Sequence, residues 1–117
     1  MERTGTLEQF EQLVLTAVAT LDDAYGVTIH DMVEQLSGRQ LQFGPIYSTL
    51  NRLENKGYVS SKTVKDPARR GGRPRRNYKI RRTGMDALKE SALTADRVRG
   101  ALQNRYGEQL WAGEHTG

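Results

Sequence analysis

The 117-residue sequence contains no cysteine, which excludes disulfide bonds, zinc–thiolate sites and a thiol nucleophile. No apolar run approaches the roughly 20 residues that a membrane-spanning helix needs, and the polar, acidic N-terminus does not resemble a secretory signal. We therefore expect an intracellular protein without a membrane segment. A chain of this length usually forms one domain.

Histidine and catalytic motifs are scarce as well. Of the two histidines, His115 lies near the C-terminus, and His30 is predicted on the polar side of a helix without a partner at ligand spacing. Zinc needs three or four nitrogen, oxygen or sulfur ligands. The sequence has no G-x-S-x-G motif and no P-loop, and Asp22 and Asp23 are neighbours at a turn rather than opposed carboxylates. We expect no metal, no cofactor, no catalytic residue and no enzyme.

Positive charge is concentrated in one stretch, residues 65–82, which holds nine basic residues and one acid, a net charge of +8. The whole chain carries +4, so the other 99 residues sum to −4. A focused patch of this kind attracts a polyanion, and seven of its nine cations are arginines, whose planar fork suits phosphate and base edges. A solvated, disordered loop is the alternative interpretation of such a charge run.

Apolar residues at spacings of three and four predict three short helices before the basic stretch, over residues 6–21, 27–37 and 44–56. The alternating residues 40–43 predict a very short strand. A capping box of Thr6 and Gln9 is expected for the first helix.

The second and third predicted helices have end signals of their own. Thr28 with Asp31 can cap the start of the second helix, and Gly38 ends it. Pro45 stands at the start of the third helix, and Gly57 follows its end.

The third predicted helix has a buried stripe and an opposite polar face. Ile46, Leu50 and Leu53 form the stripe. The opposite face is compact and carries no acid; it consists of Gly44, Ser48, Asn51, Arg52 and Asn55, with Tyr47 at its flank. Such a face fits the DNA major groove, which is about 12 Å wide. Two other interpretations stay open, because Tyr47 can cover the core edge, and Asn51 and Arg52 can be ordinary solvated residues.

The basic stretch itself predicts a hairpin. Strands over residues 58–64 and 77–80 flank a loop over 65–75, and Tyr78 and Ile80 share one face, which is expected to join the core. The order helix, helix, short strand, helix, hairpin is that of a winged helix-turn-helix. We therefore predict a mainly α fold with a small β-hairpin, the wing.

A last helix is predicted from residues 81–83 to 106, and at about 1.5 Å per residue it is over 30 Å long. It and the first helix carry more apolar residues than one small core needs, which indicates a homodimer. Arg99 stands in the stripe and is expected to meet Glu8 or Glu11 of the partner. The predicted dimer interface consists of Leu7, Phe10, Val14, Leu88, Ala92, Ala95, Leu102 and Tyr106. We divide the chain into a DNA-binding domain, residues 1–82, and a dimerisation helix with its tail, residues 83–117, as one structural unit.

Three stretches resemble the phenolic acid decarboxylase regulators, the PadR family. Residues 44–57 match its recognition helix, G-x-x-Y-x-x-L-x-x-L-E-x-x-G, and residues 71–80 match its wing, G-G-R-P-R-x-Y-Y-x-L, with Asn77 in place of one Tyr. Residues 15–26 are similar to its first helix and turn, and the resemblance covers residues 7–90. It implies a homodimeric bacterial transcription repressor of the short form, cytoplasmic and on the nucleoid, which a small-molecule effector can release from DNA.

The sequence departs from the family at two places. Arg81 stands where the family's T-x-x-G motif has the Thr that caps the last helix, and Thr83 with Asp86 offers a replacement cap. Some members place a Trp on the dimer-forming helix to sandwich flat drugs, but Trp111 lies beyond that helix, so drug binding of that kind is not expected.

The partner predicted for the polar helix face and the wing is duplex DNA. Gly72-Arg73-Pro74 with Arg75 resembles the core of an AT-hook, in which Arg enters a narrow minor groove. The alternatives are an RNA-binding module and a protein-interaction module that uses the basic stretch for an acidic partner. A groove-sized helix and a dimer, which suits a two-fold operator, favour DNA. The predicted DNA-binding residues are Tyr47, Ser48, Asn51, Arg52, Asn55, Arg69, Arg70, Gly72, Arg73, Pro74, Arg75 and Arg76.

Overall fold

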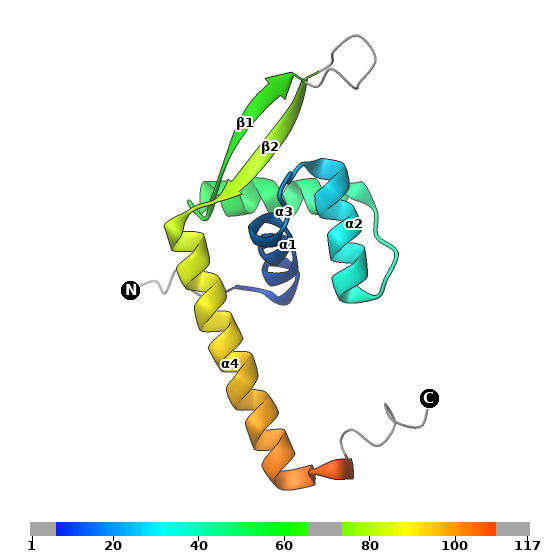
Figure 1. Cartoon of the computed structure of the whole chain (residues 1–117), viewed down its shortest axis with the longest axis vertical. Helices are drawn as coiled ribbons and strands as arrows, with labels where there is room; N and C mark the ends of the chain where they lie inside the picture. The colour runs from blue at the N-terminus through cyan, green and yellow to red at the C-terminus, as the bar shows by residue number, and fades with distance from the viewer. Residues whose placement is uncertain (1–6, 66–73, 110–117) are drawn as a thin grey trace.

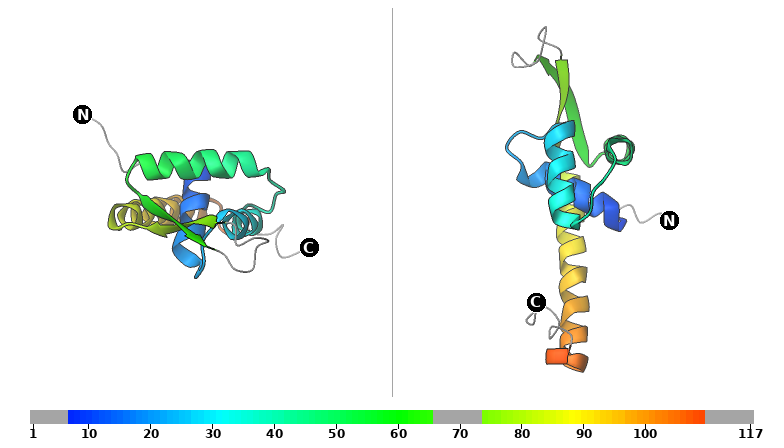
Figure 2. Two further views of the ribbon diagram at one scale, coloured as in Figure 1. Left: turned by 90° about the horizontal axis from the view of Figure 1, so that it is seen from above. Right: turned by 90° about the vertical axis from the view of Figure 1, so that its right-hand side faces the viewer.

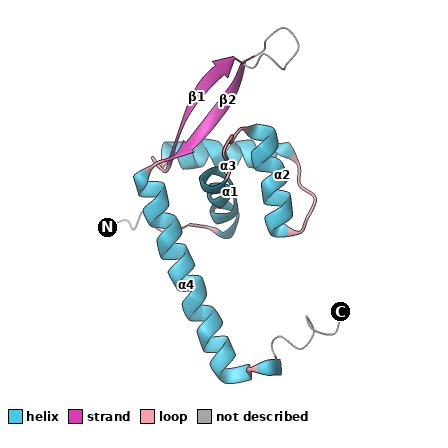
Figure 3. Ribbon diagram, viewed as in Figure 1, coloured by secondary structure: helices cyan, strands magenta, loops and turns pink. Residues whose placement is uncertain are grey.

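The computed structural model describes residues 7–65 and 74–109 of the chain. Within them the elements follow in the predicted winged-helix order, three helices, a hairpin and a long helix (Figure 1). They are α1 (Gln9–Thr20), α2 (Gly26–Ser37), α3 (Phe43–Asn55), β1 (Val59–Lys65), β2 (Pro74–Ile80) and α4 (Arg82–Tyr106). The mainly helical fold with one antiparallel hairpin is confirmed (Figure 3).

The core lies where α1, α2 and α3 meet the base of the hairpin. The predicted stripe of α3, Ile46, Leu50 and Leu53, has no exposed surface. The other buried apolar residues are Val14, Leu15, Ala17, Val18, Ala24, Ile29, Val33, Tyr58, Val59, Tyr78 and Ala87. This core packs one side of α3 and leaves its other side on the surface of the molecule (Figure 2).

Two predicted helix caps are wrong. The first helix begins at Gln9 rather than near Thr6, which lies outside the described residues, and the backbone N–H of its N-cap, Glu8, donates to Glu11 Oε1 at 3.0 Å. The second helix has Tyr25 as its N-cap, with Thr28 inside the first turn. Thr28 Oγ1 accepts from the Tyr25 N–H at 3.0 Å, so the hydroxyl caps the helix from within. Both helices therefore have a capping box, but at positions two and three residues from the predicted ones.

The connection between α2 and α3 also differs from the expectation. Gly38 ends α2 as predicted, in the left-handed conformation with φ 71°, which glycine adopts at little cost. Residues 40–43 form no strand, because α3 begins at Phe43 and Leu41 is bonded to α2 side chains instead.

The hairpin pairs β1 with β2 in antiparallel register, from Val59 opposite Ile80 to Lys65 opposite Pro74. Tyr78 is buried and Ile80 packs on the core, as predicted. The base of β2 also pairs with the α1–α2 turn, because the Tyr78 N–H donates to the Ala24 carbonyl at 2.8 Å. The wing is thus joined to the helical body at its base (Figure 1).

Helix α4 starts against the hairpin and then leaves the body (Figure 2). The predicted replacement cap is wrong: α4 begins at Arg82 with Arg81 as its N-cap, and Thr83 Oγ1 donates to the Gly57 carbonyl at 2.5 Å. At Gly84 a Cβ would collide with the Tyr58 carbonyl oxygen, so glycine lets α4 approach the strand. No helix in the described ranges is long and apolar enough to span a membrane.

Beyond Ala87, α4 is almost entirely exposed in the single chain, including Leu102 and Tyr106 of the predicted dimer stripe. Val14 was assigned to the dimer interface wrongly, since it has no exposed surface and belongs to its own chain's core. Leu7 and Phe10 are half-buried against that core. Arg99 meets Asp96 of its own helix, Nη1 to Oδ1 at 3.2 Å.

Candidate nucleic-acid interface

The side of α3 that faces away from the core is polar, exposed and free of acids. Gly44, Ser48, Asn51 and Asn55 lie opposite the buried stripe and are all exposed. The Ser48 hydroxyl donates to the Gly44 carbonyl at 2.9 Å, which leaves its lone pairs outward. The sequence-predicted face therefore exists, and it offers two carboxamides that can donate and accept at base edges.

Tyr47 stands at one flank of this face, half exposed at 46%. Its ring lies 6.3 Å from that of Phe43, and its hydroxyl rests against Gly26, where a Cβ would collide with it. Gly26 is thus the small residue that lets the first turn of α2 meet α3. The ring lies against α2 and Phe43 and stays half exposed, and its contact with DNA remains a prediction.

Arg52 stands at the other flank and bonds to the body of the protein. Its Nε donates to Glu11 Oε2 at 3.1 Å and its Nη2 donates to Thr49 Oγ1 at 3.3 Å. Lys56 Nζ also reaches Glu11, at 2.8 and 3.1 Å. Arg52 is therefore exposed as predicted, at 47%, but it also pairs with Glu11, which the sequence did not indicate.

Glu11 is the charged residue that the sequence reading missed at this place. It is 1% exposed and joins α1 to the end of α3. Burial raises the pKa of this carboxyl, but hydrogen bonds from Lys56, from the Glu8 amide and from Arg52 outweigh burial and lower the pKa below its usual value. Glu11 is therefore a buried carboxylate that binds two cations, Arg52 on α3 and Lys56 at its C-cap. It is not free to meet Arg99 of a partner.

In the wing, the neighbouring Arg75 and Arg76, which the sequence analysis grouped together, have different surroundings. Arg75 is only 18% exposed, lies 3.8 Å from the Tyr25 ring centroid and bonds to Asp23, Nη2 to Oδ2 at 2.6 Å. Arg76 is more exposed and donates to Ser61 Oγ at 3.1 Å. Pro74 is exposed at the start of β2. The remaining predicted wing residues, Arg69, Arg70, Gly72 and Arg73, lie outside the described residues.

A groove of about 470 Å³ runs between the wing, the start of α2 and α3. Aromatic rings, backbone of the α2 N-terminus and the two arginines share its walls. It is lined by Tyr25, Gly26, Val27, Tyr47, Pro74, Arg75, Arg76 and Tyr78. The groove links α3 to the wing by a surface that mixes cations, hydroxyl groups and apolar atoms.

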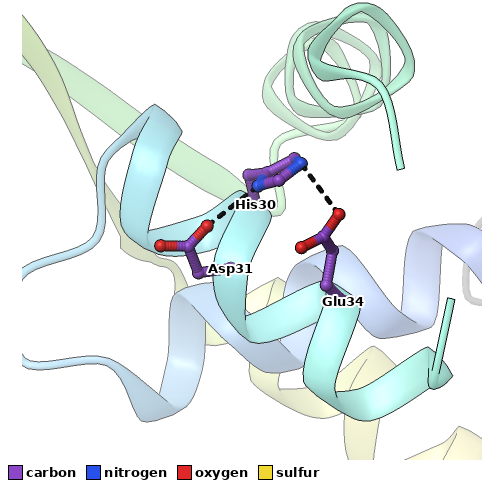
Figure 4. A group of neighbouring side chains, drawn as sticks. All are labelled: His30, Asp31 and Glu34. Atoms are coloured by element: carbon purple, nitrogen blue, oxygen red, sulfur yellow. Dashed lines mark hydrogen bonds and ion pairs between the residues drawn. The ribbon is translucent and has the colours of Figure 1, made fainter. Parts of the chain in front are cut away.

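His30 was placed wrongly on the polar side of α2, because it is buried and its ring stacks on Phe43, 4.1 Å between centroids. Its Nε2 lies 2.8 Å from the Leu41 carbonyl. Its Nδ1 lies 2.9 Å from Asp31 Oδ1 (Figure 4). Both partners are acceptors, so both ring nitrogens must carry protons to make both bonds. The hydrogen bond to Asp31, followed by that to Leu41, raises the pKa of His30 against the opposing effect of burial.

His30, Asp31 and Glu34 are close enough together to suggest a metal site, contrary to the expectation that His30 lacks a partner at ligand spacing. Their arrangement does not suit one ion. Asp31 approaches Nδ1, whereas Glu34 approaches Nε2 at 3.3 Å, so the carboxylates lie at opposite edges of the ring (Figure 4). A single ion binds one nitrogen of an imidazole, and we therefore interpret the group as hydrogen-bonded support for the start of α3.

Comparison with known protein families assigns this chain to a family. The profile of the "Transcriptional regulator PadR-like family" matches residues 14–90, which span α1 to the start of α4 and include both α3 and the hairpin. A search of curated proteins gave no match.

Solved structures share the fold. A PadR-like transcription factor from Bacteroides fragilis has TM-score 0.67 at 21% identity, over 80% of this chain and 86% of that one. A PadR family regulator from Clostridium difficile R20291 has TM-score 0.66 at 22% identity, over 86% and 100%. Bacillus subtilis PadR, solved with operator DNA, has TM-score 0.61 at 15% identity, over 73% of this chain and 47% of that one.

Proposed function

Because this chain belongs to the PadR-like family of transcriptional regulators, we propose that it is a homodimeric repressor that reads a two-fold operator through α3 and the wing. Family membership itself makes it a DNA-binding regulator and not an enzyme. The repressor role, the dimer and the residue assignments are the proposed part. So are a cytoplasmic location, on the nucleoid, and release by a small-molecule effector.

The observation that carries the proposal is the exposed, acid-free outer face of α3 beside the wing. Asn51 and Asn55 lie at its centre, and a carboxamide can pair with both N6 and N7 of adenine. We propose that Tyr47 and Ser48 contact phosphates, which fix the register of a protein on the duplex. For this the Ser48 hydroxyl would turn from the Gly44 carbonyl to donate to a phosphate oxygen. Arg52, tied to Glu11 at the flank, is better placed for a phosphate than for a base.

The wing supplies the second half of the contact. Its loop carries Arg69, Arg70 and Arg73, and Arg76 follows at the start of β2. We propose that these arginines meet the backbone or the minor groove beside the bases read by α3. Each phosphate contact contributes about 0.9 to the slope of log affinity against log salt, so four such contacts would give binding a steep salt dependence.

The dimer is supported by the exposed apolar residues of α4. Leu102 and Tyr106 of the predicted stripe are exposed along a helix that leaves the body, with exposed Val98 at their flank. Small Ala92 and Ala95 would let a second helix approach closely. An apolar surface of this kind is unusual on a small monomer. Two copies would place two recognition helices at half-sites about one turn, ~34 Å, apart.

The alternative function is an RNA-binding or protein-interaction module that uses the basic stretch for an acidic partner. Competition among duplex DNA, RNA and heparin at two salt concentrations distinguishes these partners. Footprinting on the DNA upstream of the protein's own gene then locates the operator, because such regulators often control themselves. Equal competition by all three polyanions would contradict the proposal.

The test of the recognition helix is Asn51→Ala, with Gln35→Ala on the exposed side of α2 as its control. We expect Asn51→Ala to cost about 1–3 kcal/mol on the operator and to relax the choice at one base pair, with random DNA bound as before. A uniform loss over all sequences would reassign Asn51 to the backbone.

A further inference from the structure

One carboxylate fastens two side chains of the wing to the helical body. Asp23 lies in the α1–α2 turn, and its Oδ2 accepts from Arg75 Nη2 at 2.6 Å while its Oδ1 accepts from Asn77 Nδ2 at 2.6 Å. Arg75 and Asn77 are two residues apart on β2, so both project from the same face of the hairpin. The two wing residues also bond to each other, Arg75 Nε to Asn77 Oδ1 at 3.3 Å.

This cluster extends the main-chain attachment of the wing toward its tip. The backbone joins β2 to the turn at Tyr78, which donates to the Ala24 carbonyl, and at the bridge between Asn77 and Tyr25. Asp23 reaches two residues further along β2, to Arg75, whose guanidinium covers the Tyr25 ring at 3.8 Å. A two-stranded hairpin held only at its base can swing, and a second point of attachment fixes its direction.

The ion pair between Asp23 and Arg75 contributes little to folding stability. Asp23 is 53% exposed, and an ion pair with one partner in water adds little to stability because water and salt screen it. Its geometry is nevertheless restrictive, since Arg75 is held by a carboxylate, an amide oxygen and an aromatic face together. The Asp23–Arg75 pair therefore restricts the direction of the wing more than it stabilises the fold.

We propose that Asp23 is a positioning residue for DNA recognition, which holds Arg75 and Asn77 and thereby sets the direction of the wing relative to α3. The proposal rests on the proposed function, because it is through the wing and α3 together that the protein would read DNA. The distance between the bases under α3 and the flanking stretch under the wing then depends on Asp23. Arg75, which sequence reasoning counted among the DNA contacts, serves this attachment.

The direction of the wing can be measured without DNA. The sequence has no cysteine, so Lys65→Cys on β1 and Gln35→Cys on α2, both exposed, give two defined spin-label sites. Labelled protein is diluted with unlabelled protein to suppress distances between copies. We expect Asp23→Ala to broaden the distance distribution, and Arg75→Ala to add nothing further in that background. An unchanged distribution in Asp23→Ala would overturn the proposal.

Asp22→Ala is the matched control, because it removes the same charge from the adjacent exposed residue. Loss of one negative charge should raise affinity for random duplex about equally in both variants. Only Asp23→Ala should lower discrimination among randomised flanking sequences, by about threefold or more, with the site under α3 held constant. Equal flank discrimination in Asp22→Ala and Asp23→Ala would refute the role in recognition.

Failure of this proposal differs from failure of the proposed function. If the wild type does not prefer duplex DNA to RNA, the proposed function is wrong and the DNA role of Asp23 is refuted with it. If the wild type prefers DNA but the flank choice of Asp23→Ala matches that of the wild type, the role of Asp23 alone is wrong. If Arg75→Ala lowers the salt slope by about 0.9 in the Asp23→Ala background, Arg75 is itself a phosphate contact and the attachment is not its purpose.

Discussion

Replacing Glu11 by Gln is the perturbation for which the structure gives the clearest magnitude. The carboxylate is 1% exposed and accepts from Lys56, from Arg52 and from the Glu8 amide. Removing one partner of a fully buried ion pair costs about 3–5 kcal/mol, because the other charge is left unpaired without water. Here the two cations are partly exposed and can return to water, so the low end applies. We expect Glu11→Gln to destabilise the protein by about 2–3 kcal/mol.

The pH dependence of this loss identifies its cause. The pKa of Glu11 is lowered by folding, so its contribution is present above the usual carboxyl value of 4.5 and is lost as pH falls through the folded value. Urea unfolding followed by circular dichroism at pH 7 and at successively lower pH measures the difference between wild type and Glu11→Gln. The difference should be largest at pH 7 and should shrink below pH 4.5.

The control is Glu90→Gln, which removes a carboxylate from an exposed position of α4 and should cost less than about 0.5 kcal/mol. Protein concentration is held fixed throughout, because a dimer's apparent stability depends on it. A loss below about 0.5 kcal/mol for Glu11→Gln, or an equal loss at pH 7 and pH 3, would refute the assignment of Glu11 as a stabilising buried carboxylate.

Three further predictions concern the supports of the interface. Folding raises the pKa of His30, so the stability that its protonated ring contributes is full below the usual imidazole pKa of 6.5 and is lost as pH rises through the pKa of the folded state. His30→Gln should therefore make the urea midpoint less dependent on pH between pH 5.5 and 8.5. An unchanged pH dependence of the midpoint would contradict this. Gly84→Ala should destabilise the protein by about 1–3 kcal/mol, because the new Cβ would collide with the Tyr58 carbonyl oxygen. Gly44→Ala is the control and should not destabilise the protein, because the space around Gly44 is open. Equal melting temperatures of the two variants would exclude the close approach of α4 to Tyr58. Leu102→Asp on α4 should give a monomer in sedimentation at micromolar concentration, and a wild type that is itself monomeric would disprove the dimer.

The sequence was sufficient for the features that depend on one helix or strand alone. The stripe of Ile46, Leu50 and Leu53 follows from a 3.6-residue period, which is local, and its burial is confirmed. The burial of Tyr78 follows from strand alternation in the same way. The position of Gly38 at the end of α2 depends on one backbone angle, and that was predicted correctly as well.

Two of the features that the sequence did not predict have a different physical origin, because each concerns a polar side chain whose partner is distant in sequence. Glu11 and Lys56 are 45 positions apart, and Asp23 and Arg75 are 52 apart, so no local period indicates either pair. His30 was assigned to a polar face by its type alone, although an imidazole whose nitrogens both bond can be buried. The signal that existed was the isolated acid: Glu11 interrupts the apolar side of α1 between Phe10 and Val14.

These long-range pairs change how the basic stretch should be understood. Counting charges treats Arg75 and Arg76 as equal members of one +8 strip, whereas the structure gives Arg75 to Asp23 and leaves Arg76 more exposed. Likewise Arg52 and Lys56 of α3 share the buried charge of Glu11. The net charge that DNA would meet is therefore smaller than the sequence total, because Glu11 and Asp23 each pair with part of the positive charge. Under the proposed function, DNA recognition would depend on where the acids lie as much as on how many arginines there are.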